Sequence, residues 1–265
     1  MTELNVTLTA ISTILEQAGR EIILPAFQTS VQSSTKSDGS VVTETDLASQ
    51  QFIQHALKKL DASIAFLGEE MTKTDQLACL QHSGGRYWCL DPLDGTTNFT
   101  THFPGFAISL ALIENGIVKL ACIHDPVRCE TFTAERNNGA ALNGISVSAS
   151  LNDELSNAVG FIDFKRLAPA LATAMATHPN YRSQRNIGSC ALEWAWLAAG
   201  RGQFIIHGGE KIWDFAAGSL IASEAGCMVS NFASMPLFPC DTLSSPVLAA
   251  CKPAIHASLK RQLTD

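Results

Sequence analysis

The chain has 265 residues, of which 46% are hydrophobic and 16% charged, a balance typical of a compact protein with a sizeable core. Its formal net charge of −7 argues against a general nucleic-acid-binding surface, so no nucleic-acid partner is expected. No apolar run approaches the roughly 20 residues of a membrane span, and the N-terminus lacks a signal-peptide pattern, so no membrane partner is expected. The eight cysteines include no C-x-x-C pair, which argues against a zinc site or a thioredoxin-like site. The compartment expected for this chain is a reducing cytoplasm.

The first half of the chain is predicted to form two helices packed on a largely antiparallel sheet. Apolar residues at helical spacing predict a helix over residues 4–27 that ends near Pro25, and a polar loop or hairpin follows over 29–39. Thr43 or Thr45 is expected to cap a second helix that runs to about residue 60. The expected strands of this half span residues 63–67, 87–90, 106–113, 117–124, 128–133 and 140–142.

From about residue 146 the pattern changes to alternating strands and helices, which is typical of an α/β lobe. The expected elements are strands over 158–161 and 202–207, and helices over 167–177, 189–199 and 215–225. We therefore expect two lobes, residues 1–145 and residues 146–265, which share a continuous core.

The most informative segment runs from Asp91 through Pro92, Leu93, Asp94, Gly95, Thr96, Thr97 and Asn98 to Phe99. It follows a short apolar strand and places two carboxylates and a glycine-led turn at the end of that strand. Carboxylates bind hard divalent cations through oxygen, and backbone N–H groups after a glycine bind phosphate. The same residue types also favour an ordinary surface turn. The apolar residues before the segment place its carboxylates near the core, which argues for a metal-assisted phosphate site.

Further carboxylates lie at similar places elsewhere in the chain. Glu69 follows a predicted strand, Asp214 lies at a helix start, and Asp46 lies in the first turn of the second helix. Oxygen-only ligation favours Mg²⁺ or Mn²⁺ over zinc, and two such ions about 3.5–4 Å apart can hold both reacting oxygens of a phosphate ester. Taken singly, each acid has a simpler explanation: a helix cap for Asp214, a solvated turn for Glu69 and a favourable first-turn charge for Asp46.

In these motifs the chain resembles the inositol monophosphatase family, within the superfamily of lithium-sensitive, Mg²⁺-dependent phosphatases. The order and spacing fit along nearly the whole chain, and the Asp91 segment is the most specific of the matches. The matching pieces are Gly68-Glu69-Glu70, Asp91 to Phe99, and Trp213-Asp214-Phe215-Ala216-Ala217-Gly218, with Lys36-Ser37-Asp38, Thr45-Asp46 and Gly188-Ser189 also similar.

The resemblance implies a layered αβαβα sandwich of the α/β (α+β) class, with the active site between the two lobes, and a homodimer. It also implies roles for the motif residues. The Mg²⁺ ligands would be Glu69, Asp91, the Leu93 carbonyl, Asp94 and Asp214, with Mn²⁺ as a substitute ion. Thr96 would position the nucleophilic water, with Asp46 behind it and Glu69 also taking part in catalysis. Gly95, Thr96 and Thr97 would bind the phosphate, and the loop with Lys36 would close over the site.

The reaction predicted from this resemblance is hydrolysis of a small polyol or sugar phosphate, with inositol 1-phosphate favoured, by a metal-activated water. Fructose 1,6-bisphosphate, histidinol phosphate and a 3′-phosphonucleotide are the alternative substrates. No Ser, Cys or Asp lies in a recognisable nucleophile motif, so no phosphoenzyme is expected. A regulatory protein that kept the fold is the competing hypothesis, and the complete set of ligand positions argues against it.

The alcohol half of the substrate is expected near Arg185, Gly188, Ser189 and His207. Relatives often carry a glutamate six or seven positions before the Trp-Asp pair, where this chain has His207, with Glu210 nearby. A neutral imidazole cannot accept two hydroxyl hydrogen bonds as a carboxylate can. Either the substrate differs, or Glu210 takes over this role, or His207 simply ends a strand.

Overall fold

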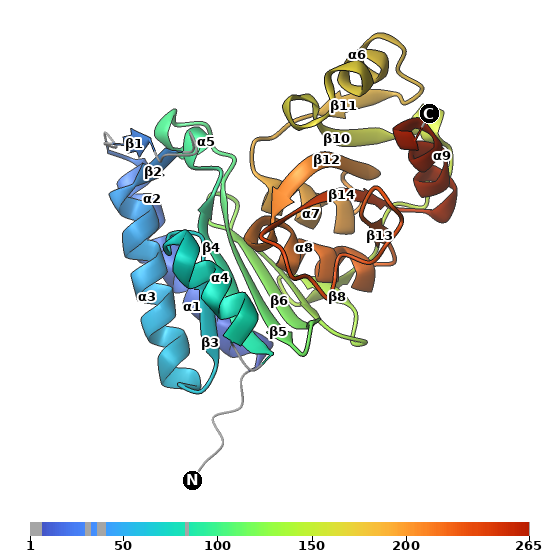
Figure 1. The fold of residues 1–265 in the computed structure, drawn as a ribbon. Coiled ribbons are helices and arrows are strands. Elements are labelled where there is room, and N and C mark those ends of the chain that lie inside the picture. Colours follow the sequence, from blue (N-terminus) through green and yellow to red (C-terminus); the bar gives the residue numbers. More distant parts are fainter. Residues whose placement is uncertain (1–6, 30–32, 36–40, 83–84, 265) are drawn as a thin grey trace.

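The computed structural model describes residues 7–29, 33–35, 41–82 and 85–264. Lys36, expected in a closing loop, lies outside these residues. Five layers stack in the order helices, sheet, helices, sheet, helices, which confirms the predicted αβαβα sandwich (Figure 1). Among the described residues, no helix has the length and apolar content needed to cross a membrane.

The helices of the outer and central layers differ in what they cover. The first layer lies against the seven-stranded sheet, the central pair lies between the two sheets, and the last layer lies beyond the five-stranded sheet (Figure 1). In this order the helices are α1 (Leu8–Ala18) and α3 (Glu44–Leu60), then α7 (Cys190–Ala198) and α8 (Ile212–Glu224), then α6 (Pro169–Thr177) and α9 (Pro253–Thr264). The first turns of α7 and α8 bring the second half of the chain to the candidate site.

The seven-stranded sheet runs in chain order from β3 to β9, and only its β3–β4 pair is parallel. This confirms the largely antiparallel sheet. Its strands are β3 (Ala65–Gly68), β4 (Arg86–Asp94), β5 (Ala107–Glu114), β6 (Ile117–Asp125), β7 (Glu130–Glu135), β8 (Ala140–Leu142) and β9 (Ile145–Val147). A helix between β3 and β4, α4 (Lys73–His82), was not expected.

The five-stranded sheet has the order β11-β10-β12-β14-β13. The pairs β10–β11 and β10–β12 are parallel, so the carboxyl ends of these three strands lie at one edge. The strands are β10 (Val159–Asp163), β11 (Ser183–Arg185), β12 (Phe204–Lys211), β13 (Met228–Ser230) and β14 (Ser244–Ala250). Of these, β11, β13 and β14 were not expected, nor was α9.

Strand β4 explains why carboxylates reach the centre of the molecule. Tyr87 and Cys89 point into the core shared with α8, whereas Trp88 and Leu90 point into the core beneath α1 and α3. A strand covered on both faces reads as a continuous apolar run, which is how the sequence shows it. The residues that follow this run therefore emerge between packed layers instead of at an exposed turn.

The first helix differs from its prediction near Pro25. After α1 the chain makes a π-helical turn over Gly19–Ile23 and continues as α2 (Leu24–Phe27). The helical run therefore ends at Phe27, the last residue of the expected range and two residues beyond Pro25, which lies in the first turn of α2. A proline inside a helix lacks the N–H and crowds the preceding turn, and here that turn is the wider π-helical one. After this helix, the short strands β1 (Ser33–Thr35) and β2 (Val41–Thr43) pair antiparallel.

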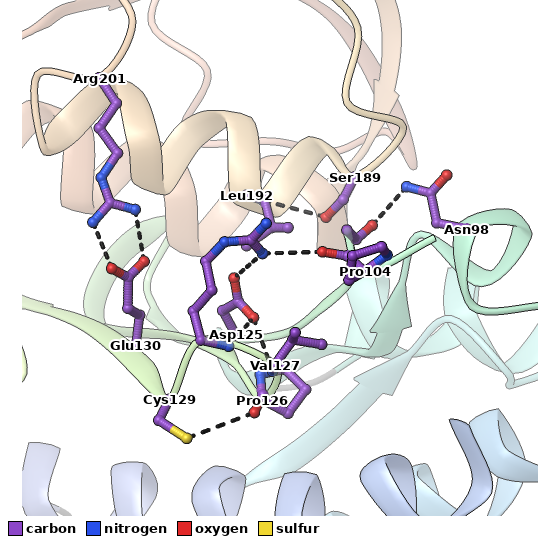
Figure 2. A network of polar contacts seen from close by, with 12 residues as sticks. Asn98, Pro104, Asp125, Pro126, Val127, Cys129, Glu130, Ser189, Leu192 and Arg201 are labelled. Carbon is purple, nitrogen blue, oxygen red and sulfur yellow. Dashed lines mark hydrogen bonds and ion pairs between the residues drawn. The ribbon is translucent and has the colours of Figure 1, made fainter. Parts of the chain in front are cut away.

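Polar contacts tie the end of α7 to the seven-stranded sheet (Figure 2). Arg201, which follows α7, donates two hydrogen bonds of 2.6 Å to the Glu130 carboxylate on β7. Nearby, Arg128 donates to Asp125 Oδ2 at 2.8 Å and to the Pro104 carbonyl at 3.0 Å. A bidentate arginine–carboxylate pair has a fixed geometry, so the far end of α7 is held in place.

Candidate active site

Three of the predicted metal ligands converge. Asp91 and Asp94 end β4, and Asp214 lies in the first turn of α8. One carboxylate oxygen from each of the three lies within 4.8 Å of the other two. Asp91 and Asp94 are buried, and Asp214 is half-buried. The structure thus brings together side chains that are more than a hundred positions apart in the sequence.

Local backbone geometry aims these carboxylates. The register between β4 and β5 shifts between Asp91 and Asp94, and Asp91 Oδ1 accepts a 2.9 Å hydrogen bond from the Leu93 N–H. Helix α8 begins at Ile212, three residues earlier than expected, so Lys211 and not Asp214 is the cap residue. Asp214 Oδ2 accepts the Lys211 N–H at 3.0 Å. Asp214 therefore supports the helix start and also belongs to the acidic cluster.

The electrostatics of the cluster favour a cation. Burial raises the pKa of Asp91 and Asp214 well above the usual range, and nearby carboxylates, Glu69 among them, raise both further. Burial also raises the pKa of Asp94 to about 6, although a hydrogen bond from Ser189 opposes the shift. Charge repulsion of this kind is relieved by a bound cation, and an all-oxygen donor set fits Mg²⁺.

Glu69 and Leu93 lie beside the three aspartates. Glu69 follows β3, and its N–H donates to the Leu90 carbonyl at 3.1 Å, which holds the residue against β4. Its charge raises the pKa of Asp91, so its carboxylate lies near the cluster. Leu93 is buried, and its carbonyl accepts the Thr96 hydroxyl at 3.1 Å.

Thr96 and Asp46 form a second feature of the site. The Thr96 hydroxyl lies 2.9 Å from Asp46 Oδ1 and 3.1 Å from the Leu93 carbonyl, the two acceptors available to its proton. The Asp46 carboxylate also accepts the Thr43 N–H at 2.8 Å, as part of the capping box of α3. Burial raises the pKa of Asp46, while hydrogen bonds from Thr43 and Thr96 oppose this shift. The helix start thus holds the threonine hydroxyl in place.

Glycines let two distant segments meet beside this hydroxyl. Gly95 has φ +94, and a Cβ there would lie 2.8 Å from the Gly105 carbonyl and 3.2 Å from the Gly188 carbonyl. Asn98 bridges the same segments, because its Nδ2 donates to the Gly105 carbonyl at 2.6 Å and to the Ile187 carbonyl at 2.8 Å. The close approach places Gly188 and the residue after it against the end of β4.

Ser189 is the cap residue of α7 and lies next to an aspartate of the cluster. Its hydroxyl donates to Asp94 Oδ2 at 2.6 Å, and the Ala191 N–H donates to the same oxygen at 2.6 Å. Ser189 also accepts the Leu192 N–H, as Figure 2 shows. A carboxylate that receives N–H groups at a helix N-terminus is stabilised in its charged form.

Two other predicted site residues, Thr97 and Arg185, form hydrogen bonds with groups outside the three aspartates. Thr97 is exposed, and its carbonyl accepts hydroxyl groups of the following turn. Arg185 is exposed and folds back along β11, where its Nη1 donates to Ser183 Oγ and the Gln184 carbonyl, both at 2.7 Å. The geometry therefore shows no contact between Arg185 and the three aspartates.

His207 and Glu210 are both held by protein groups. His207 is 7% exposed; its Nδ1 accepts the Gly209 N–H at 3.1 Å, and its Nε2 lies 3.5 Å from Asp163 Oδ2. Glu210 is 1% exposed and accepts the Trp194 indole N–H at 2.8 Å. His207 does not end its strand, because β12 continues past a bulge to Lys211.

Sequence reasoning did not assign a role to Glu193. This residue of α7 is 6% exposed, and its Oε1 accepts the Ile187 N–H at 2.6 Å. Burial raises its pKa to about 8, despite that hydrogen bond. A single glutamate within the apolar run of residues 190–199 was the available signal, because ionisable side chains are rarely buried without a specific partner.

Comparison with known proteins decides the family. The model of the inositol monophosphatase family matches residues 4–264. The chain belongs to the inositol monophosphatase family. A fructose-1,6-bisphosphatase/inositol-1-monophosphatase from Thermotoga maritima is 36% identical over 196 residues, which is 72% of each chain. The Nus factor SuhB of Escherichia coli K12 is 36% identical over 213 residues, 76% of each chain.

A solved structure agrees with this assignment. The structure of an IMPase from Thermotoga maritima superposes with a TM-score of 0.83 at 30% identity, covering 96% of this chain and 94% of that one. The family resemblance expected from the motifs is therefore confirmed, and so is the mixed α/β fold.

Proposed function

We propose that this family member is a Mg²⁺-dependent phosphomonoesterase that acts on a small polyol or sugar phosphate, with inositol 1-phosphate as the first candidate. The observation that carries the proposal is the convergence of Asp91, Asp94 and Asp214 within 4.8 Å. An all-oxygen cluster beside a fixed hydroxyl suits metal-assisted ester hydrolysis better than nucleophilic catalysis. The name of the Thermotoga maritima relative supports the same chemistry.

The metal ligands in this proposal are Glu69, Asp91, the Leu93 carbonyl, Asp94 and Asp214, with Mn²⁺ able to replace Mg²⁺. Bound divalent ions supply Lewis-acid chemistry, because they lower the pKa of a water and neutralise phosphate charge. Lithium inhibition is expected from the family resemblance and provides an inexpensive second test.

The chain's own residues orient the reactants. The Thr96 hydroxyl donates toward Asp46, which leaves its oxygen lone pairs free to accept a hydrogen bond from the attacking water. Gly95, Thr96 and Thr97 would bind phosphate oxygens at the end of β4. Attack by water in line with the leaving alcohol requires no phosphorylated side chain.

The alcohol half of the substrate would lie near Arg185, Gly188, Ser189 and His207. The geometry favours an indirect part for His207, because both of its ring nitrogens face protein groups. Asp163 Oδ2 lies 3.5 Å from His207 Nε2, and we propose this carboxylate as an acceptor for substrate hydroxyls in place of the glutamate. Because His207 stands where relatives often carry a glutamate, fructose 1,6-bisphosphate, histidinol phosphate and a 3′-phosphonucleotide remain alternative substrates.

Phosphate release from a panel of esters tests the proposal. The panel contains inositol 1-phosphate, fructose 1,6-bisphosphate, histidinol phosphate and adenosine 3′,5′-bisphosphate, each with and without Mg²⁺. Asp94→Asn should lower kcat at least about 100-fold, because a ligand charge is lost from the cluster. Asp153→Asn removes an exposed carboxylate and is the matched control. Unchanged turnover by Asp94→Asn, or no release from any ester, would contradict the proposal.

The similarity to proteins named Nus factor SuhB supports a second candidate, a regulatory binding role on the same fold. A binding role of this kind does not require the aspartate cluster, so Asp94→Asn should leave it intact while abolishing hydrolysis. We propose a homodimer in the cytoplasm, and the net charge of −7 favours a protein partner over nucleic acid or a membrane. Light scattering of the purified chain measures its oligomeric state directly.

A further inference from the structure

A buried hydrogen bond joins the middle of α7 to the second sheet. The Trp194 indole N–H donates to Glu210 Oε2 on β12 at 2.8 Å. Both side chains are buried, Trp194 being 0% and Glu210 1% exposed. A hydrogen bond to a carboxyl group in such a site is stronger than one at the surface, because water does not compete for either partner.

The contact is specific to this position of the helix. Trp196 lies two residues further along α7, and its buried indole N–H has no partner among the described residues. Glu210 Oε1 likewise has no hydrogen-bond partner in the described part of the chain. Burial of a carboxyl group with one unsatisfied oxygen costs stability, so an apolar side chain would serve a purely packing role better.

Trp194 lies between α7 and α8, the two helices whose first turns meet at the acidic site. A Cβ added to Gly218 of α8 would lie 2.2 Å from the Trp194 Cβ, so the two helices cross in contact at this residue. On α7, Ala191 lies one turn before Trp194, and its N–H donates to Asp94 Oδ2 at 2.6 Å. A change in the rotation of α7 would therefore displace a donor to Asp94.

We propose that the Trp194–Glu210 hydrogen bond is a positioning contact that fixes the rotation of α7, so that Ser189 and Ala191 stay directed at Asp94. Glu130 and Arg201 hold the far end of the helix, and the new contact fixes its middle. The inference rests on the proposed function only in taking Asp94 as a metal ligand. Groups that orient a metal ligand typically change metal affinity or activity about 10–100-fold when they are removed.

Three single variants test the contact. Trp194→Phe removes the indole donor, Glu210→Gln keeps an acceptor for it, and Trp196→Phe removes an indole N–H that has no partner. The measurements are amide hydrogen exchange at Ala191 in protein treated with EDTA, Mg²⁺ binding by calorimetry, and kcat and KM for the best ester of the panel.

Trp194→Phe should raise the exchange rate of the Ala191 amide about 10-fold and weaken Mg²⁺ binding about 10-fold, the lower end of the range for such groups. Its kcat should fall more than its KM changes, because the substrate-facing groups are retained. Trp196→Phe should stay within about 2-fold of the native protein in every measurement, since it loses no hydrogen bond. Glu210→Gln should stay within about 2-fold in amide exchange at Ala191, since it keeps an acceptor for the indole N–H.

Equal behaviour of Trp194→Phe and Trp196→Phe in amide exchange would overturn the inference, and so would faster exchange without weaker Mg²⁺ binding. If Trp194→Phe does not fold, Glu210→Met removes the acceptor at similar volume and must give the same pattern. A native protein that binds no Mg²⁺ and hydrolyses no ester contradicts the proposed function. The exchange rate at Ala191 still decides whether the contact orients α7.

Discussion

Glu193→Gln should change the pH dependence of stability in a direction that follows from burial. Burial raises the pKa of Glu193 from its ordinary value of 4.5 to about 8 in the folded chain. Between these two values the folded state keeps a proton that the unfolded state has released. The free energy of unfolding therefore falls as pH rises through this window, by about 1.4 kcal/mol per pH unit at most.

The magnitude for this one side chain follows from the same shift. From pH 5 to pH 8 the native chain should lose about 3 kcal/mol through Glu193, after allowing for partial ionisation at both ends of the window. Glutamine does not titrate, so Glu193→Gln lacks this loss. Relative to the native protein, the variant should gain about 3 kcal/mol of stability between these pH values.

Urea unfolding in EDTA at pH 5, 6, 7 and 8 measures the difference. Asp91 and Asp214 also have raised pKa values, but they are present in both proteins and their contributions largely cancel in the comparison. Glu44→Gln removes an exposed glutamate and serves as the control. If the curves for the native chain and Glu193→Gln stay parallel across the pH range, the reasoning from burial is refuted.

Two further substitutions test the positions of atoms at the site. Thr96→Val removes the hydroxyl beside Asp46 and should lower kcat about 100-fold with a small change in KM. The reason is that a misplaced reactant lowers the rate more than it weakens substrate binding. Equal losses in kcat and KM would contradict this role for Thr96. Gly218→Ala places a Cβ 2.2 Å from the Trp194 Cβ and should lower the free energy of unfolding by about 1–3 kcal/mol in urea. At Gly209 the nearest atom to an added Cβ lies 3.5 Å away, so a loss as large in Gly209→Ala would argue against overpacking as the cause.

Elements with strong local signals were predictable from the sequence. Thr43 and Asp46 form the capping box of α3, so the helix start lies within two residues of its expected place. The hairpin of β5 and β6 turns at Asn115-Gly116, where both residues have positive φ. In each case the signal lies within a few residues of the feature, and no distant contact is needed to select the conformation.

Elements defined by distant contacts were harder to predict. Helix α4 carries a mixture of polar and apolar residues without a clear apolar stripe, so periodicity did not identify it. The expected strand ends at His207, whereas β12 continues through Gly208 and Gly209 to Lys211. A Cβ at Gly208 would lie 1.7 Å from the Arg166 carbonyl, so close approach of another segment requires glycine within β12.

At the site, too, residues with a local sequence signal were predictable, and residues whose burial depends on distant contacts were not. This burial has an energetic consequence. Asp91 and Asp94 were predictable because both lie in one motif, whereas the burial of Glu193 and Glu210 beside them depends on how α7 and β12 meet. Burial raises the pKa of each of these acids and repulsion between neighbouring carboxylates raises it further, so the fold disfavours its own negative charge at neutral pH. A divalent cation that binds only the folded chain would offset this cost. Metal binding and folding stability should therefore be linked, with the stabilisation by added Mg²⁺ growing as pH rises and protons compete less for the carboxylates.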